Sequence, residues 1–284
     1  MTLAAQKISA EALADMLEMF AVQPWLQTLH AEMAELWSLC QSREEQILLK
    51  TLLSKFYILD SAKEHAACRG IAEKIIEWGL VHTDTWIVAT ANREEIDGST
   101  AGLQKLKNKM QPIESWHARM ISNIPAAVDK IKSGDNVLLF DDFIGSGGKM
   151  ITKKEWLIRL LVKEGVVGNK FFYVGFTGMR FGVEHIKAAT GESVFVHHAL
   201  LKGISESYPA VEAAGMKSLM LQLESRLGKT YRNKKLVDYS LGYGKSEALY
   251  CGQNDNCPNN VFPILWWPTR GDGGYGKTVL VRAG

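Results

Sequence analysis

The sequence predicts an α/β protein whose parallel strands alternate with helices. Apolar runs at residues 85–90, 137–140 and 171–176 have the length of strands, and each precedes a segment in which apolar residues recur with the helical period. The run at 137–140 is apolar without alternation, as expected for a strand that is covered on both faces of a parallel sheet. Strands and helices in this order favour parallel pairing with right-handed crossovers.

A helical section precedes the first expected strand. Leu13, Met16, Leu17 and Phe20 are spaced as i, i+3, i+4 and i+7, which makes one face of a helix apolar. The helical period continues at 26–36, 47–59 and 62–78. The elements expected after these are, in order, strand 85–90, helices 100–110 and 115–132, strand 137–140, helix 150–163, strand 171–176, helix 182–190, strand 194–199 and helix 209–227.

We expect two parts within one compact unit. Residues 1–80 form an α-helical N-terminal layer, and residues 81–284 form an α/β domain with an irregular C-terminal segment. Burial of each Leu or Trp side chain in the layer contributes about 1.5–3 kcal/mol, so the layer is expected to be integral to the fold. Residues 258–266 are expected to pack across the sheet near this layer, with Asn259 and Asn260 capping or lining the pocket.

Charge and composition exclude several classes of protein. A formal net charge of +2 over 284 residues is not the global signature of a polyanion-binding protein. The four cysteines are scattered, and the spacing of Cys251 and Cys257 is not that of a zinc knuckle, so we expect neither a disulfide framework nor a structural metal. We find no signal-peptide pattern and no apolar run long enough to span a membrane, and we expect a soluble, cytoplasmic protein.

The clearest indication of function lies directly after residues 137–140. Ligands of open α/β sheets bind at the carboxyl ends of strands, where Asp141 and Asp142 are expected. Carboxylates accept hydrogen bonds from vicinal hydroxyls, while a glycine-rich turn before a helix directs amides and the helix dipole at one phosphate. A diol beside a phosphate describes a ribose 5-phosphate, although an acidic pair with glycines can also simply end a strand. The turn consists of Gly145, Ser146, Gly147 and Gly148, and Lys149 follows it.

Residues 137–149 resemble the 5-phosphoribosyl-1-pyrophosphate (PRPP) motif of the type I phosphoribosyltransferases. That motif is an apolar strand, two acidic residues, two apolar residues and a Thr/Gly/Ser-rich loop. The variant Phe-Asp-Asp-Phe-Ile-Gly-Ser-Gly is similar, more narrowly, to phosphoribosyltransferase-like proteins of bacterial conflict and antiphage-defence operons, as are residues 25–59, 249–250 and 258–266. The resemblance implies a type I phosphoribosyltransferase-like parallel sheet flanked by helices.

The resemblance also implies roles for single residues. Asp141 and Asp142 would be catalytic, holding the ribose hydroxyls and steadying positive charge at C1, while residues 145–148 and Lys149 would bind the 5′-phosphate. Ser99 and Thr100 would face pyrophosphate and Mg²⁺, which the phosphorylated ligand carries. Arg180 could hold a pyrophosphate oxygen or a base, with a solvated arginine as the alternative.

Two departures from the family pattern leave two functions open. Lys149 stands where metabolic members usually have Thr, and residues 90–100 are only loosely similar to a pyrophosphate loop. The chain is expected either to transfer or cleave a glycosidic bond, as the toxic effector of a retron or similar defence system, or to be an inactive PRPP or nucleotide sensor. An ATPase or a reverse transcriptase from the same operon would be its protein partner.

Two further patterns carry weaker interpretations. Residues 271–278 satisfy the pattern of a nucleotide-binding P-loop, but no helix is expected after them, and phosphate binding by that motif requires one. We therefore interpret the segment as a glycine-rich hairpin or chain end. The basic stretch at 226–235 indicates a solvated face, with direct nucleic-acid contact as the alternative.

Overall fold

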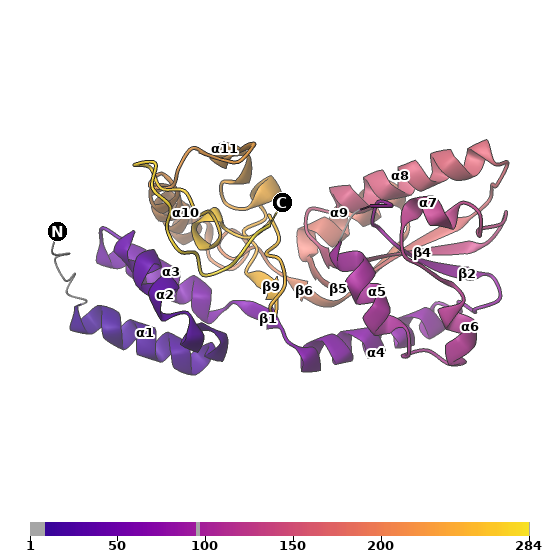
Figure 1. The fold of residues 1–284 in the computed structure, drawn as a ribbon, viewed down its shortest axis with the longest axis horizontal. Coiled ribbons are helices and arrows are strands. Elements are labelled where there is room, and N and C mark those ends of the chain that lie inside the picture. The colour runs from indigo at the N-terminus through magenta and orange to yellow at the C-terminus, as the bar shows by residue number, and fades with distance from the viewer. Residues whose placement is uncertain (1–8, 95–96, 284) are drawn as a thin grey trace. The chain divides into compact units, whose positions relative to one another are not determined.

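The computed structural model describes residues 9–94 and 97–283. The chain divides into two compact units (Figure 1). We call Leu59–Leu201 the sheet unit, and Met1–Ile58 together with Lys202–Gly284 the terminal unit. None of the helices in the described residues is long and apolar enough to cross a membrane.

The sheet unit is built on a parallel sheet, which has five strands among the described residues. Their order across the sheet is β3-β2-β4-β5-β6, with bounds of Thr85–Ala89 for β2, Met120–Ile121 for β3, Asn136–Ile144 for β4, Lys170–Met179 for β5 and Ser193–Leu200 for β6. In the centre, Val137 of β4 pairs with Trp86 on one side and Phe171 on the other. Residues 137–140 are completely buried, so the predicted α/β class and the predicted central strand are both confirmed.

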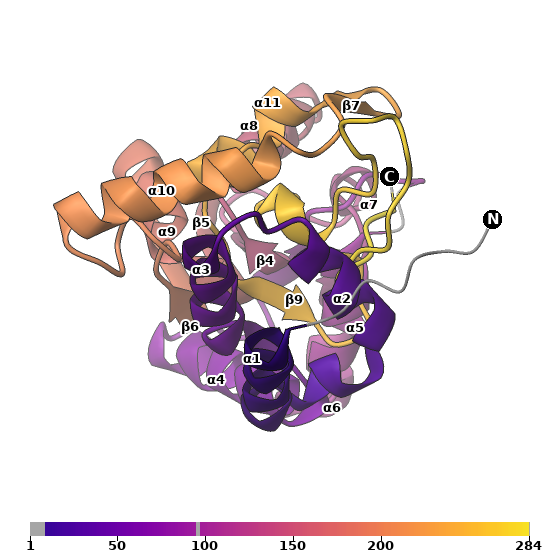
Figure 2. The ribbon, with the colours of Figure 1, turned by 90° about the vertical axis from the view of Figure 1, so that its left-hand side faces the viewer.

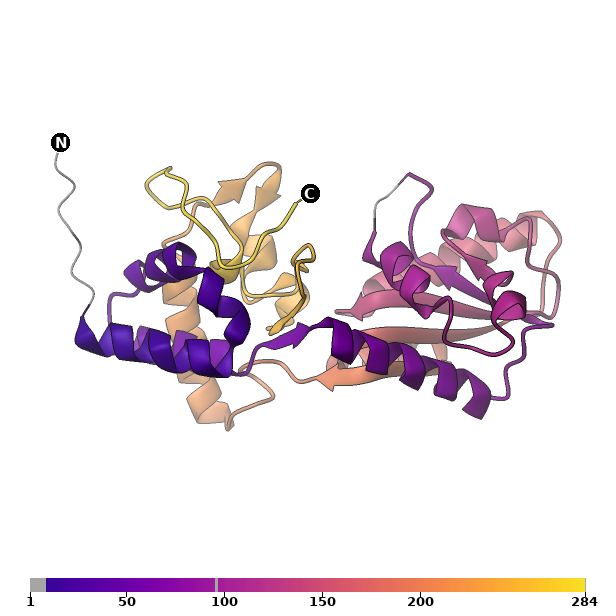
Figure 3. The ribbon, with the colours of Figure 1, turned by 60° about the horizontal axis from the view of Figure 1, so that its bottom comes forward.

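Helices cover both faces of the sheet (Figures 1 and 3). On one face, α4 (Ser61–Glu77) contacts β5 and β6, and α5 (Gly98–Leu106) contacts β4. On the other face, Leu139 packs in a core with Leu157 of α8 (Gly148–Lys163) and Ile186 of α9 (Arg180–Thr190). Because successive residues of β4 point to opposite faces, both halves of the core depend on this one strand.

The single helix predicted at 115–132 is wrong. The structure has α6 (Ile113–His117), the short strand β3 and α7 (Ile124–Ala127) in its place. Asn123 caps α7, since its Oδ1 accepts a hydrogen bond from the Ala126 amide at 2.9 Å. Pro125 has no N–H and is tolerated in the first turn of α7 but not inside a longer helix.

The terminal unit combines helices from both ends of the chain (Figure 2). It contains α1 (Ala10–Val22), a 3₁₀ helix (Pro24–Thr28), α2 (His30–Ser38), α3 (Arg43–Ser54) and α10 (Ala210–Glu224). The helix predicted at 47–59 ends at Ser54, because Tyr57–Leu59 forms strand β1, which pairs with β9 (Tyr250–Gly252). The Arg226 guanidinium donates to buried Glu45 of α3 at 2.6 Å and to the Leu39 carbonyl at 2.6 Å, which ties the two segments together.

The rest of the terminal unit consists of short elements. These are β7 (Thr230–Tyr231), β8 (Lys234–Lys235), α11 (Leu236–Tyr239) and 3₁₀ turns at Tyr243–Lys245 and Pro263–Leu265. Trp266 and Trp267 are buried with ring centroids 5.4 Å apart, and Asn260 donates to the Ser246 hydroxyl at 2.8 Å. Within the described residues 279–283 no helix follows the P-loop-like segment, and the antiparallel bridge between Thr269 and Tyr275 agrees with its interpretation as a glycine-rich hairpin.

This grouping differs from the expected parts 1–80 and 81–284. Helix α4 lies with the sheet because Gly70 allows close approach to β6: a Cβ there would lie 2.3 Å from His197 Nδ1. Residues 258–266 lie in the terminal unit with α10 rather than in the sheet unit. The physical reason is that the buried Glu45–Arg226 pair and the β1–β9 pairing join the N-terminal helices to the C-terminal segment.

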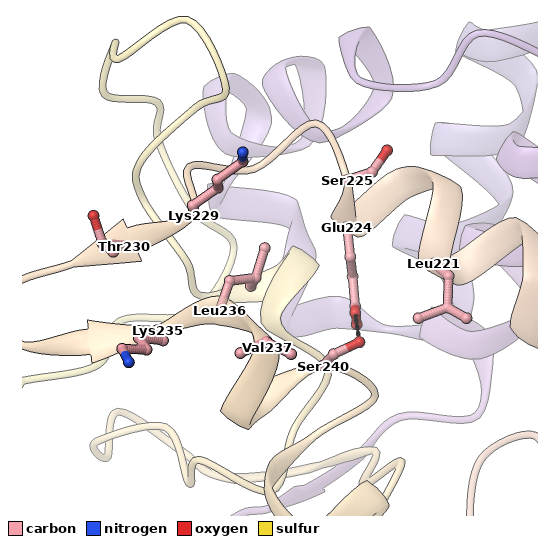
Figure 4. Close-up of a pocket in the computed structure, with 9 residues that line it drawn as sticks. All are labelled: Leu221, Glu224, Ser225, Lys229, Thr230, Lys235, Leu236, Val237 and Ser240. Carbon is pink, nitrogen blue, oxygen red and sulfur yellow. Dashed lines mark hydrogen bonds between the residues drawn. The ribbon is translucent and has the colours of Figure 1, made fainter.

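A pocket of about 460 Å³ opens in the terminal unit beside the end of α10 (Figure 4). Leu221, Leu236 and Val237 supply its apolar wall. The buried Glu224 carboxylate accepts hydrogen bonds from the Ser240 hydroxyl at 2.6 Å and the Leu241 amide at 3.0 Å. Burial raises the pKa of Glu224 to about 6, so this carboxyl group titrates near neutral pH.

Candidate functional site

The candidate site lies at the carboxyl edge of the sheet unit. Asp141 and Asp142 are the sixth and seventh residues of β4, which extends to Ile144 before the glycine turn begins. Gly147 has a left-handed conformation, with φ of 82°, and α8 starts at the next residue without a side-chain cap. The first N–H groups of α8 therefore point out of the helix beside the turn, where an anion can bind.

The glycine turn packs against the start of α9. A Cβ on Gly182 would lie 1.9 Å from the Gly145 carbonyl oxygen, and one on Gly147 would lie 2.5 Å from the Gly182 carbonyl oxygen. His185 Nδ1 lies 2.8 Å from the Ser146 carbonyl oxygen. Helix α9 thus holds the turn in one place, and only glycine at position 182 permits this approach.

Three carboxylates converge at this edge. Asp97, Asp141 and Asp142 each place an oxygen within 4.8 Å of the others, and we call them the acidic cluster. Asp97 caps α5 by accepting a hydrogen bond from the Ser99 amide at 2.7 Å. The start of α5 also abuts Asp142, because a Cβ on Gly98 would lie 2.5 Å from Asp142 Oδ2. Such a cluster could bind vicinal hydroxyls or a hard cation.

Lys149 joins the acidic cluster to the glycine turn. Its Nζ lies 3.0 Å from Asp97 Oδ2 and 3.1 Å from Asp141 Oδ1. The Lys149 side chain is 42% exposed, whereas that of Asp141 is only 3% exposed. The buried carboxylate is therefore paired with the ammonium group of a partly exposed side chain.

The electrostatics of the cluster follow from burial and from Lys149. Burial raises the pKa of Asp141 and of Asp142, and the Lys149 ammonium opposes that rise. Burial acts in the same direction on Asp97, but there the Lys149 ammonium and the hydrogen bond from the Ser99 amide outweigh it and leave the pKa lowered. Burial acts to lower the pKa of Lys149, but the carboxylates outweigh it, so its pKa is raised and the side chain stays a cation.

The structure brings some of the other predicted residues to this edge and not others. Ser99 is buried beside Asp97, and its hydroxyl has no hydrogen-bond partner among the described residues. The Thr100 hydroxyl donates to the Ser122 carbonyl at 3.0 Å. Arg180 is the exposed first residue of α9. Residues 95–96 of the loosely matched loop lie outside the described residues.

Sequence reasoning missed part of the site. Asp97 was not predicted as a site residue, although an acidic residue before Gly98-Ser99-Thr100 and a helix is an N-cap signal that could have placed it at the edge. Thr90, which follows β2 and begins the candidate loop at 90–100, and Thr177 in β5 were also not named as site residues. Both hydroxyls are buried and, within the described parts of the chain, have no hydrogen-bond partner. Buried orphan hydroxyls carry no sequence signal.

A parallel sheet with an acidic cluster and a glycine turn at its carboxyl edge defines a phosphoribosyltransferase-like protein. The chain belongs to the PRTase-CE family, whose model matches residues 39–275. No curated protein matches the chain.

The chain is similar to two solved structures at low sequence identity. The chain is similar to adenine phosphoribosyltransferase from Thermoanaerobacter pseudethanolicus, with 14% identity, 49% of this chain and 82% of that chain covered, and a TM-score of 0.31. It is also similar to a hypothetical protein from Neisseria gonorrhoeae with bound ppGpp, with 15% identity, coverage of 57% and 93%, and a TM-score of 0.33.

Proposed function

We propose that the carboxyl edge of the sheet unit binds a ribose 5-phosphate ligand, either PRPP or a nucleotide. The observation that carries the proposal is the acidic cluster beside an uncapped helix start, with Lys149 in contact with the cluster. Carboxylates suit a diol and the helix start suits a phosphate. Family membership supports the same ligand class.

We assign each part of the proposed ligand to a group of residues. Asp141 and Asp142 hold the ribose hydroxyls, while the amides and the Ser146 hydroxyl of the turn at 145–148 hold the 5′-phosphate. Ser99, Thr100 and Arg180 serve the pyrophosphate side, where Mg²⁺ is carried by the ligand rather than by a resident site. The orphan hydroxyl of Ser99 supports this assignment, because a buried hydroxyl gains free energy when a ligand pairs with it.

The activity that we propose is glycosyl transfer or cleavage of a nucleotide's glycosidic bond. Positive charge develops at the ribose C1 as that bond breaks, and the neighbouring carboxylates stabilise it without a protein nucleophile. We further propose that this activity makes the chain the effector of a bacterial antiphage defence system, held in check in the cytoplasm by an ATPase or reverse transcriptase of the same operon. The chain's similarity at 137–149 to conflict-associated members supports this context.

One observation favours an alternative, a sensor that binds the ligand without turnover. Lys149 is paired with Asp97 and Asp141, so an ammonium group occupies part of the space in which a ligand's hydroxyls would bind. Arg180 is exposed rather than turned into the cluster, which leaves the pyrophosphate side weakly built. A protein with these features would bind the ligand without reaction, and ligand binding would change its interaction with a protein partner.

Calorimetry with PRPP and common nucleotides, paired with product analysis, tests both functions. Binding with release of free base or pyrophosphate supports the enzyme, and binding without product over hours supports the sensor. The double variant Asp141→Asn/Asp142→Asn should lose binding at least tenfold, about 1.4 kcal/mol. Asp129→Asn, an exposed residue of the same unit, is the matched control and should bind normally. Full ligand affinity in the double variant would overturn the assignment.

A further inference from the structure

The acidic cluster needs a positive charge to be stable. Asp97, Asp141 and Asp142 have oxygens within 4.8 Å of one another, a distance at which like charges strongly oppose joint ionisation. Asp141 is almost fully buried, so water cannot screen it. Such a site resolves the conflict by keeping a proton, which burial favours at Asp141 and Asp142, or by binding a cation, since carboxylate oxygens are the ligands that Mg²⁺ and Ca²⁺ prefer.

In this chain Lys149 supplies that charge. Its ammonium is within hydrogen-bond distance of Asp97 and Asp141 at once, at 3.0 Å and 3.1 Å. An Mg²⁺ ion bound by the same two oxygens would lie about 2.0–2.1 Å from each. The ammonium group and such an ion would therefore compete for the same space between the carboxylates, and their like charges exclude joint occupancy.

The position of Lys149 also offers its ammonium group a second partner, an anion bound at the glycine turn. It is the second residue of α8, directly after the glycine turn at which the proposed phosphate binds. Lysine carries its charge on a flexible four-carbon stem, so a small rotation of the stem moves Nζ from a carboxylate to an anion beside the turn. The Lys149 side chain is 42% exposed and is not locked by packing on all sides.

We propose that Lys149 is a tethered replacement for a metal ion in the acidic cluster, and that it makes metal binding conditional on the ligand. In the free protein, Lys149 neutralises Asp97 and Asp141 and excludes divalent cations. When a phosphorylated ligand binds, its anionic group attracts the Lys149 ammonium away from the carboxylates, and the cation that accompanies the ligand neutralises the carboxylates instead. The first half concerns the free protein alone, and the second half rests on the proposed function.

The first half is tested with Mn²⁺ as the only probe, by electron paramagnetic resonance of the free ion in titrations of the full-length chain. Wild type should bind Mn²⁺ at least tenfold more weakly than Lys149→Met, in which the carboxylates are left without a counter-ion. Lys163→Met, at the exposed far end of the same helix, should match wild type. The double variant Asp97→Asn/Lys149→Met should lose the affinity that Lys149→Met gained, which assigns the new site to the cluster.

Wild-type protein that binds Mn²⁺ as tightly as Lys149→Met would overturn the proposal, as would a gain in Mn²⁺ affinity that survives Asp97→Asn. Should Lys149→Met fail to fold by circular dichroism, Lys149→Gln replaces it, and tight Mn²⁺ binding to wild type remains decisive against the proposal by itself.

The second half is tested by adding ribose 5-phosphate or PRPP to wild type. A rise in Mn²⁺ affinity of at least fivefold is expected for wild type, and a smaller rise for Lys149→Met, whose cluster is already open. An equal rise in both proteins would overturn the conditional role of Lys149. If neither sugar phosphate binds at all, the proposed function and this second half fail together, while the Mn²⁺ comparison in the free protein still decides the first half.

Discussion

Gly182→Ala should displace the glycine turn from a distance, without changing any residue that the proposed ligand touches. The new Cβ would lie 1.9 Å from the Gly145 carbonyl oxygen, 3.0 Å from its carbon and 3.1 Å from the Ser146 carbonyl carbon. Non-bonded carbon atoms prefer about 3.5–4.0 Å, and all three clashing atoms are backbone, so the turn must move by roughly 1 Å or more. Overpacking of this kind costs about 3 kcal/mol, the upper end of its usual range.

Two assays measure the consequence. Urea denaturation should show a loss of about 3 kcal/mol in the free energy of unfolding, and calorimetry with ribose 5-phosphate should show at least tenfold weaker binding, since a misplacement of 1 Å can cost far more in a positioned site. Gly215→Ala in α10 is the matched control, because nothing lies within 4 Å of the added Cβ. Removal of a glycine from a helix interior should there raise stability by about 1 kcal/mol. A Gly182→Ala protein with wild-type stability and affinity would refute the role of this contact.

Three other predictions concern the terminal unit. Because the pKa of Glu224 is raised from 4.5 to about 6, the folded state binds its proton more tightly, and this group's contribution to stability is full below pH 4.5 and lost as pH rises through 6. Between pH 4.5 and 7 this group should lower the free energy of unfolding of wild type by about 2 kcal/mol, and Glu224→Gln should abolish that decrease in urea titrations. An unchanged pH profile in Glu224→Gln would contradict the raised pKa. Arg226→Met should lower the free energy of unfolding, measured by thermal unfolding, by about 3 kcal/mol, because the Glu45 carboxylate, whose side chain is 2% exposed, loses its counter-ion. A loss below about 1 kcal/mol would contradict a buried ion pair. Deletion of residues 1–58 should give an insoluble or molten product, because it removes Glu45 from Arg226 and exposes the face of α10 that packs on α3. If the fragment 59–284 unfolds cooperatively and binds ribose 5-phosphate normally, the N-terminal helices are dispensable.

The four longer strands of the sheet, β2, β4, β5 and β6, were predictable because their signals are local. Residues 137–140 are apolar without alternation, as expected of a strand covered on both faces, and the structure buries all four. The error at 115–132 has the opposite cause. Helical periodicity continues through Pro125 and Asn123, but Asn123 caps a new helix, and β3 gains hydrogen bonds from β2 that the sequence does not reveal.

The sequence by itself determined the sheet class and the order of Asp141, Asp142, the glycine turn and Lys149, because these residues are neighbours along one strand, one turn and one helix start. Only the tertiary structure decided that Asp97, 52 positions before Lys149, completes the acidic cluster and that one ammonium group serves two of its carboxylates. It also decided that α4 joins the sheet and that residues 202–284 join the N-terminal helices. The physical reason is that burial and charge pairing act between residues that packing brings together, whereas the periodicity of a sequence depends only on residues that are close along the chain.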